Sequence, residues 1–119
     1  MRGVHEGRFE IESQTDPWIK YGDELLIMGQ VVKALEYYDR ALKGSSKYTQ
    51  TRAWQSKANA LDAMGKYNDA IECYDSALSC DPEDAECWFN KGILLKKMGQ
   101  ENEGATCIHK AIHFAMGHQ

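Results

Sequence analysis

Tryptophan recurs at a nearly fixed interval along this chain. Trp18, Trp54 and Trp88 lie 36 and 34 residues apart in a sequence of 119 residues. Two dipeptides keep the same spacing: Met-Gly at 28–29, 64–65 and 98–99, and Ala followed by Leu or Ile at 41–42, 77–78 and 111–112. A period of this length is typical of solenoids, in which each structural unit buries an apolar face against its neighbour. The chain is therefore expected to contain three copies of one unit.

Each copy is predicted to form two amphipathic helices. In the second copy, Trp54, Ala58 and Leu61 recur at helical spacing before Gly65, and a second apolar set recurs at the same spacing after it. The second set is Ala70, Ile71, Tyr74, Ala77 and Leu78. This pattern predicts a helix-turn-helix unit that is hinged at the glycine.

Capping residues place several helix boundaries. Asp16 followed by proline is a typical helix start, and Gly29 is expected to end that helix after Met28. The next helix is predicted at 31–43, and the last at about 102–115. The first copy is two residues longer than the second, so either a longer loop or an extra half-turn at the start of the third helix must accommodate the difference.

Small residues recur where the two helices of a copy are expected to cross. They are Gly22, Ala58 and Gly92 on the first helices, and Ala34, Ala70 and Gly104 on the second helices. Larger side chains at these positions would overpack the crossing, so the two helices are predicted to approach closely. The third copy is the weakest, in part because Gly104 replaces alanine at a cost of about 1 kcal/mol in helix propensity.

The order of residues in the second copy resembles the tetratricopeptide repeat, a helix-turn-helix unit of about 34 residues. The shared features are Trp, a small residue and Leu, followed by Ala, an aromatic residue, Ala and Pro. The resemblance covers residues 15–118, with repeats at about 15–50, 51–84 and 85–118. It implies an all-α fold, an α-solenoid of three helix pairs stacked with a right-handed superhelical turn. Residues 1–14 match no repeat and are expected to form a flexible lead-in.

Charge and hydropathy disfavour two classes of partner. The net charge of −4 at pH 7 argues against a broadly basic nucleic-acid surface. A helix that spans a bilayer needs an apolar run of about 18 residues, and no run in this sequence approaches that length. The start of the chain carries Arg2, Glu6 and Arg8 in place of the apolar core of a signal peptide. We therefore expect a cytoplasmic location, with no nucleic-acid or membrane partner.

No catalytic or cofactor-binding motif is present in the sequence. It contains no Gly-rich phosphate loop, nucleophile elbow or His-Glu-x-x-His pattern. His109 and His113 have no carboxylate at helical spacing to complete a metal site, so solvent-exposed histidines are expected. The cysteines fit no zinc spacing and are expected to be reduced, partly buried thiols: Cys73, Cys80, Cys87 and Cys107. The chain is predicted to be neither an enzyme nor a cofactor- or metal-binding protein.

The resemblance also implies a binding surface. In this family, the first helices of successive pairs line a concave groove that holds a peptide or helix of a partner protein. The groove residues predicted on this basis are Ile19, Asp23, Arg52, Gln55, Asn59, Glu86, Phe89, Asn90 and Ile93. Ile19, Phe89 and Ile93 are predicted to be exposed apolar anchors, because exposed apolar groups with a polar rim mark interaction sites. The predicted function is a protein–protein interaction module.

The end of the array carries a second candidate surface. In the second copy, Tyr74, Ala77 and Leu78 should be covered by the helix that begins at about residue 85. The matching residues of the third copy are Ile108, Ala111 and Ile112, and only seven residues follow them. Since solenoid ends usually need a cover, these residues are predicted to pair two copies of the chain as a symmetric dimer. A removed downstream segment and the apolar residues of 9–11 are alternative covers.

Two other functions remain open at the level of the sequence. The chain could be a structural module that assembles with itself, or a regulatory domain of a larger enzyme or sensor protein.

Overall fold

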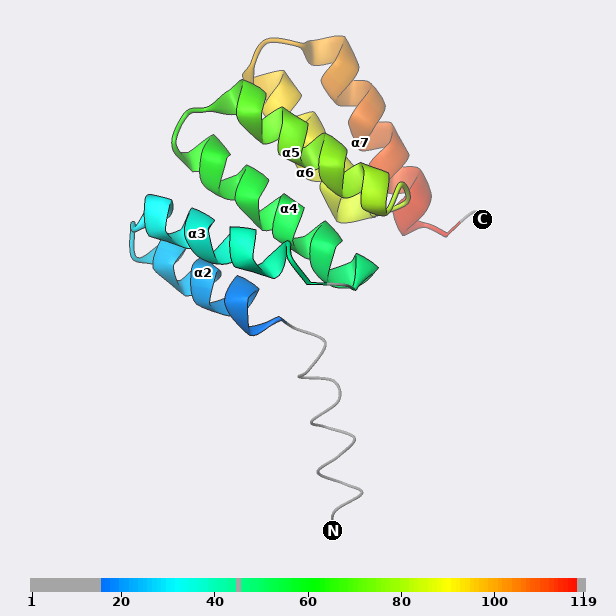
Figure 1. Ribbon diagram of the computed structural model, residues 1–119. Coiled ribbons are helices and arrows are strands. Elements are labelled where there is room, and N and C mark those ends of the chain that lie inside the picture. The colour runs from blue at the N-terminus through cyan, green and yellow to red at the C-terminus, as the bar shows by residue number, and fades with distance from the viewer. Residues whose placement is uncertain (1–15, 45, 118–119) are drawn as a thin grey trace, which may run out of the picture.

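The computed structural model describes residues 16–44 and 46–117, which fold into six α-helices (Figure 1). They are α2 (Pro17–Ile27), α3 (Val31–Ala41), α4 (Lys47–Ala63), α5 (Tyr67–Cys80), α6 (Ala85–Lys97) and α7 (Glu101–Ala115). Consecutive helices form three antiparallel pairs, and the pairs pack against one another in chain order. The predicted all-α solenoid of three helix pairs is confirmed.

Every helix pair is joined by the same glycine turn. Gly29, Gly65 and Gly99 have positive φ angles of 84°, 78° and 89°, which glycine adopts without strain. The residue after each glycine donates its backbone N–H to the carbonyl oxygen five positions earlier, the hydrogen bond that commonly closes a helix. The three bonds are Gln30 to Leu25, Lys66 to Leu61 and Gln100 to Leu95, each 2.9 Å long. The repeated Met-Gly dipeptide therefore marks the same chain reversal in all three pairs.

The two additional residues of the first copy lengthen α4. This helix begins at Lys47, where the Ser46 hydroxyl accepts a hydrogen bond of 3.3 Å from the backbone N–H of Thr49. The boundary expected between residues 50 and 51 therefore falls inside α4. Of the two alternatives, extra helix at the start of α4 is the one observed, while α3 ends at Ala41, two residues earlier than predicted.

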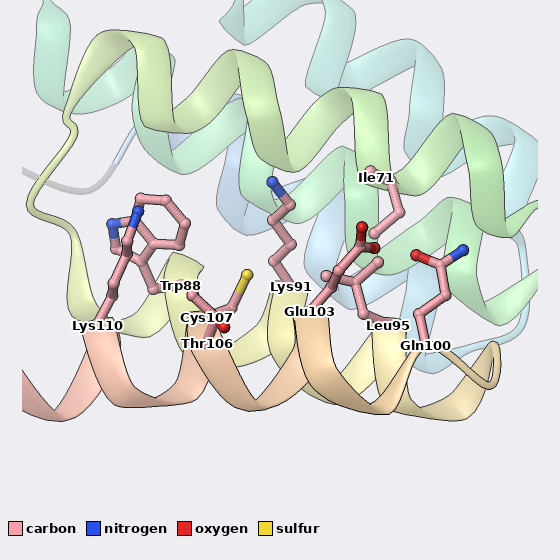
Figure 2. Close-up of a pocket in the computed structure, with 9 residues that line it drawn as sticks. All are labelled: Ile71, Trp88, Lys91, Leu95, Gln100, Glu103, Thr106, Cys107 and Lys110. Atoms are coloured by element: carbon pink, nitrogen blue, oxygen red, sulfur yellow. The ribbon is translucent and has the colours of Figure 1, made fainter.

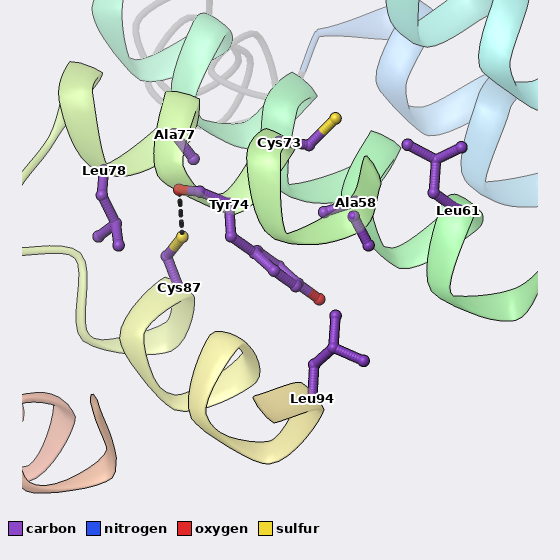
Figure 3. Close-up of a cluster of buried hydrophobic side chains, with 9 residues drawn as sticks. Ala58, Leu61, Cys73, Tyr74, Ala77, Leu78, Cys87 and Leu94 are labelled. Atoms are coloured by element: carbon purple, nitrogen blue, oxygen red, sulfur yellow. Dashed lines mark hydrogen bonds between the residues drawn. The ribbon is translucent and has the colours of Figure 1, made fainter. Parts of the chain in front are cut away.

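Two tyrosines at equivalent positions fill the core. Tyr38 is completely buried and Tyr74 is 2% exposed. Figure 3 shows the Tyr74 side chain extending from α5 toward Ala58 of α4 and Leu94 of α6. The Cys87 thiol donates a hydrogen bond of 3.5 Å to the backbone carbonyl of Tyr74. Helix α6 therefore covers the second pair, as the sequence predicted.

The third pair is packed through two glycines. A Cβ atom added to Gly92 would lie 2.8 Å from the carbonyl oxygen of Gly104, and one added to Gly104 would lie 2.7 Å from the carbonyl oxygen of Gly92. The second pair carries Ala58 and Ala70 at these positions, and both are fully buried. The backbones of α6 and α7 therefore approach too closely at this crossing to accommodate a methyl group without movement.

Three of the four cysteines belong to the core. Cys73, Cys87 and Cys107 are buried, Cys80 is half-buried, and all four thiols are free. Burial raises the pKa of the Cys87 thiol from 9.0 to about 12, and the nearby Asp84 carboxylate adds to this shift. Burial also raises the pKa of Cys73 and Cys107. The prediction of thiols that act as small buried apolar side chains is confirmed for these three.

Alkaline pH is expected to weaken the fold. Because the folded-state pKa of Cys87 is raised, the stability that the neutral thiol contributes is fully present below pH 9.0 and is lost as the pH rises toward about 12. Between pH 8 and 10 this thiol alone should lower the free energy of unfolding by about 1 kcal/mol. Urea unfolding at several pH values measures the slope, and Cys87→Ala should reduce it. An equal slope in both proteins would contradict the assignment.

Candidate interaction surface

The first helix of each pair turns one stripe of residues toward the next pair. In α4, Arg52 forms an ion pair of 3.1 Å with Glu86 of α6. Asp62, almost three turns further along α4, forms one of 2.8 Å with Lys97 of α6. Gln55 lies between these two on the same face of the helix. We call this face, with its equivalents in α2 and α6, the stacking stripe.

In α2 and α4 the stacking stripe is largely covered. Ile19 is 4% exposed and packs in a core cluster that includes Ala53 and Ala60 of α4. The prediction that Ile19 is an exposed groove anchor is therefore wrong, because the second pair covers it. Gln55, at the equivalent position of α4, is 3% exposed. Its Oε1 atom is buried and accepts no hydrogen bond from the residues that the structure describes.

Two other predicted groove residues hold the helix pairs together. The Tyr38 hydroxyl donates a hydrogen bond of 2.6 Å to Asp23, and the Tyr74 hydroxyl donates one of 2.5 Å to Asn59. Burial, followed by the hydrogen bond to Asp23, raises the pKa of Tyr38, and burial raises the pKa of Tyr74. Both phenols therefore stay protonated at neutral pH and act as donors. Asp23 and Asn59 orient the second helix of their own pair against the first.

In helix α6 the stacking stripe is exposed to solvent. Phe89, at the position of Ile19 and Gln55, is 47% exposed, and Ile93 is 45% exposed. Asn90 is half-buried beside them, and Glu86 is exposed but paired with Arg52. No helix in the described residues packs against α6 in the way that α4 packs against α2. The apolar anchors predicted at Phe89 and Ile93 are therefore accessible.

Helix α7 extends this exposed apolar surface. Ile112 is 51% exposed, whereas Leu78, its equivalent in the second pair, is 8% exposed under α6. Met116, one turn beyond Ile112, is 59% exposed. We use the name end face for the side of the third pair that carries Phe89, Ile93, Ile112 and Met116. It corresponds to the side of the second pair on which α6 lies.

The other two residues predicted for self-association are less accessible. Ala111 is 4% exposed, so its inclusion in an open face is corrected. Its equivalents Ala41 and Ala77 are 1% and 0% exposed, and all three are buried by the helix pair to which they belong. Ile108 is half-buried, and its Cγ1 would lie 2.7 Å from a Cβ atom added to Gly92. Ile112 alone of the three is well exposed.

The opposite end of the stack is polar. Lys20 and Glu24 of α2 are exposed, whereas the equivalent residues of α4, Ser56 and Ala60, are buried against the first pair. A charged side chain at an open end keeps it solvated, while an alanine there would need a neighbouring helix. The first pair therefore carries charges at these two positions, although Ile27, on the same face of α2, is 86% exposed, whereas the end face of the third pair is apolar.

The sequence contained a signal that separates these positions. Ile19, Gln55 and Phe89 share one register, yet only Phe89 belongs to a pair with no following pair in the described chain. Treating the three as equivalent groove residues overlooked the helix that covers the first two. The difference that the sequence shows is the residue type: Phe89 is aromatic, whereas the buried residues at the same register are an isoleucine and a glutamine.

The histidines, acidic residues and thiols do not form a metal site in the part of the chain that the structure describes. No three His, Cys, Asp or Glu side chains there lie close enough together to bind an ion. His109 and His113 are both exposed, as predicted. Among the described helices, none combines the length and the apolar character that crossing a bilayer requires.

The stack of helix pairs defines the class of protein, an α-solenoid. A family model described as "TPR repeat" matches residues 58–99. Two crystal structures of MamA resemble the fold, each at 20% sequence identity, with TM-scores of 0.74 and 0.72 over 83% and 86% of this chain. This chain spans 57% of each MamA chain. A search of curated proteins found no match. Residues 58–99 therefore match the tetratricopeptide repeat, a family whose members are in general protein–protein interaction modules, and the described chain has the fold of an α-solenoid.

Proposed function

We propose that this chain binds a helix or extended segment of a partner protein along its groove, and that the third pair supplies the main anchors. The observation that carries the proposal is the exposure of Phe89 and Ile93, which lie one helical turn apart on α6. Ile19 and Gln55, the equivalents of Phe89 in the preceding pairs, are buried. Asn90 follows Phe89 directly, and Asn59 holds in α4 the position that Ile93 holds in α6, so both could offer amide groups to a bound backbone. Binding of this kind requires no cofactor and no catalytic group.

The contact between α6 and the second pair indicates what the partner presents. Helix α6 buries Cys87 and Leu94 there, one on each side of the helix midpoint, and adds ion pairs at its two ends. A partner helix with a similar apolar stripe and charged ends would fit the end face in the same way. The net charge of −4 supports a protein partner in preference to a nucleic acid.

Replacing Phe89 by alanine is expected to weaken partner binding while leaving the fold intact. Loss of a central aromatic anchor typically costs about 2 kcal/mol of binding free energy or more, whereas its 47% exposure limits the loss of stability. Isothermal titration calorimetry with a partner captured from the source cells measures affinity, and thermal unfolding measures stability. Val32→Ala is a matched control, since Val32 is 64% exposed on α3 and lies outside the groove. A large loss of stability with unchanged affinity would make Phe89 a structural residue.

A second candidate function is assembly of two copies of the chain. The contrast between the charged end at Lys20 and Glu24 and the apolar end face favours it. A head-to-tail filament would bury these charges, so the favoured arrangement joins two end faces symmetrically. In this arrangement Ile112 and Phe89 of each copy are at the interface.

A further inference from the structure

The outer side of the third pair carries a pocket that is separate from the end face. It has a volume of about 460 Å³ and lies between α5, α6 and α7 (Figure 2). Trp88, Lys91 and Leu95 line it from α6, and Cys107 and Lys110 line it from α7. At 3.6 residues per turn, these α6 residues share a face that points away from Phe89 and Ile93. We call this pocket the Trp88 notch.

The first pair shows what fills the same position there. Tyr37 stacks on Trp18 with ring centroids 5.6 Å apart and an interplanar angle of 27°. The Arg40 guanidinium lies 5.2 Å from the Trp18 ring and 5.0 Å from the Tyr37 ring. Tyr21 contacts the edge of Tyr37 at 4.8 Å. The chain thus stacks a second aromatic ring on its own tryptophan and places a cation beside both.

The third pair keeps the tryptophan and the cation but lacks the second ring. Cys107 stands 19 residues after Trp88, as Tyr37 stands 19 residues after Trp18. Lys110 takes the position of Arg40, and its ammonium lies 4.5 Å from the Trp88 ring centroid. Exchange of tyrosine for the much smaller cysteine removes one aromatic ring from this position. The Trp88 notch is therefore the arrangement of the first pair with its stacking partner missing.

The second pair has a related pocket of about 360 Å³, but its charges differ. Cys73 replaces the tyrosine there too, while Ser76 stands at the position of Arg40 and Lys110. The carboxylates of Asp69 and Glu72 line that pocket. Its cation, Lys57, lies 5.5 Å from the Trp54 ring centroid but is already paired with Asp39 at 2.9 Å. The pocket therefore has a tryptophan ring without an unpaired cation at the position of Lys110, and it serves as an internal comparison for the Trp88 notch.

The charge at the Trp88 end of the notch favours an anionic group. Lys91 is paired with Asp75 at 2.6 Å, so its charge is already balanced. Lys110 has no ion pair with any residue that the structure describes. Figure 2 shows Lys110 beside Trp88, with Glu103 and Gln100 toward the other end of the pocket. A carboxylate near Trp88 would therefore meet an uncompensated ammonium group.

We propose that the Trp88 notch binds an aromatic side chain of a partner protein, stacked on Trp88, together with an adjacent carboxylate held by Lys110. The bound ring takes the place that Tyr37 occupies on Trp18, and Lys110 takes the role of Arg40. Offset stacking and the nearby cation both stabilise such a ring. This site does not depend on the groove or on the end face, so it can be tested separately from the proposed function.

The test is a nuclear magnetic resonance titration of the full chain with N-acetyl-tyrosine, which carries one ring and one free carboxylate. The indole N–H signal of Trp88 is expected to shift and saturate with a Kd of about 1 mM, a typical scale for so small a ligand. N-acetyl-tyrosine amide, which lacks the charge, should bind several-fold more weakly. Lys110→Met should remove this difference between the two probes, since it keeps the aliphatic stem of the side chain but not the charge.

Cys107→Tyr provides the decisive variant, because it rebuilds the first-pair arrangement and should abolish the Trp88 shift. Cys73→Tyr is the matched control in the second pair and should leave the shift unchanged. If Cys107→Tyr does not fold, Lys110→Met, at an exposed position, still decides the question. A wild-type protein with no saturable shift at Trp88, equal binding of the acid and the amide, or full binding by folded Cys107→Tyr would each overturn the proposal.

Discussion

Replacing Gly92 by alanine is expected to lower the free energy of unfolding by about 1–3 kcal/mol, the usual cost of overpacking a tight core. Helix propensity alone predicts the opposite sign, a gain of about 1 kcal/mol for alanine over glycine. The added methyl carbon would lie 2.8 Å from the backbone oxygen of Gly104 and 2.7 Å from Cγ1 of Ile108. Ile108 can change rotamer, but the carbonyl oxygen moves only if α7 moves. Packing should therefore outweigh propensity at this position.

Urea unfolding of the wild-type and Gly92→Ala proteins measures the difference. Ala58→Gly is the matched change in the second pair, where alanine already fits and is fully buried. That variant should lose about 2 kcal/mol, about half through helix propensity and about half through the loss of one buried methyl group. Increased stability in Gly92→Ala would show that α6 and α7 are farther apart than this geometry requires.

The repeat period was sufficient to predict the helix pairs, because each repeated residue has a local physical role. The Met-Gly dipeptide requires a positive φ at glycine, and the three observed angles meet that requirement. Asp16 caps α2 by accepting a hydrogen bond of 2.8 Å from the backbone N–H of Trp18. Such signals depend on a few neighbouring residues and can be identified in the sequence. The tetratricopeptide fold follows from them.

Placement of the candidate site was less complete, because burial depends on which helix lies opposite. Ala111 and Ile112 are adjacent, and both match residues that are buried in the second pair, Ala77 and Leu78. Ala77 and Ala111 are covered within their own pairs, but Leu78 is covered by α6, and Ile112 has no corresponding cover in the described chain. The sequence shows that both positions are apolar, but it does not show which neighbour buries each one.

The hydrogen bonds of the first two pairs illustrate the same limit. Asp23 and Asn59 have the polar character of groove residues, yet each accepts a hydrogen bond from a core tyrosine. The third pair replaces the combination of tyrosine and acceptor with Ile108 and Ile93. The tyrosine hydroxyl and the side chain that accepts its hydrogen bond are therefore both absent from the third helix pair. This joint loss is visible in the sequence, and it indicates that the two positions interact in the first two pairs.

Arginine at position 111 is expected to unfold the third helix pair, whereas arginine at position 112 should leave it folded. Ala111 is 4% exposed, so Ala111→Arg would place an unpaired charge in the core, where such a charge typically costs about 3–5 kcal/mol. Ile112 is 51% exposed, so the longer side chain of Ile112→Arg can reach solvent. Circular dichroism melting curves measure the difference. A folded, wild-type-like Ala111→Arg would show that residue 111 faces solvent.

The same variants also test the symmetric dimer. Wild-type protein at high micromolar concentration is expected to scatter light as more than the 13.5 kDa of one chain, and Ile112→Arg should return it to that mass because two arginines would meet at the interface. Lys20→Met, at the charged end, is the control and should not change the mass. A wild-type monomer would exclude the dimer, whereas a dimer that survives Ile112→Arg would have to use a surface other than the end face. Because Ile112→Arg is expected to retain the fold, which the melting curves check, loss of the dimer in this variant would be attributed to the end face and not to unfolding.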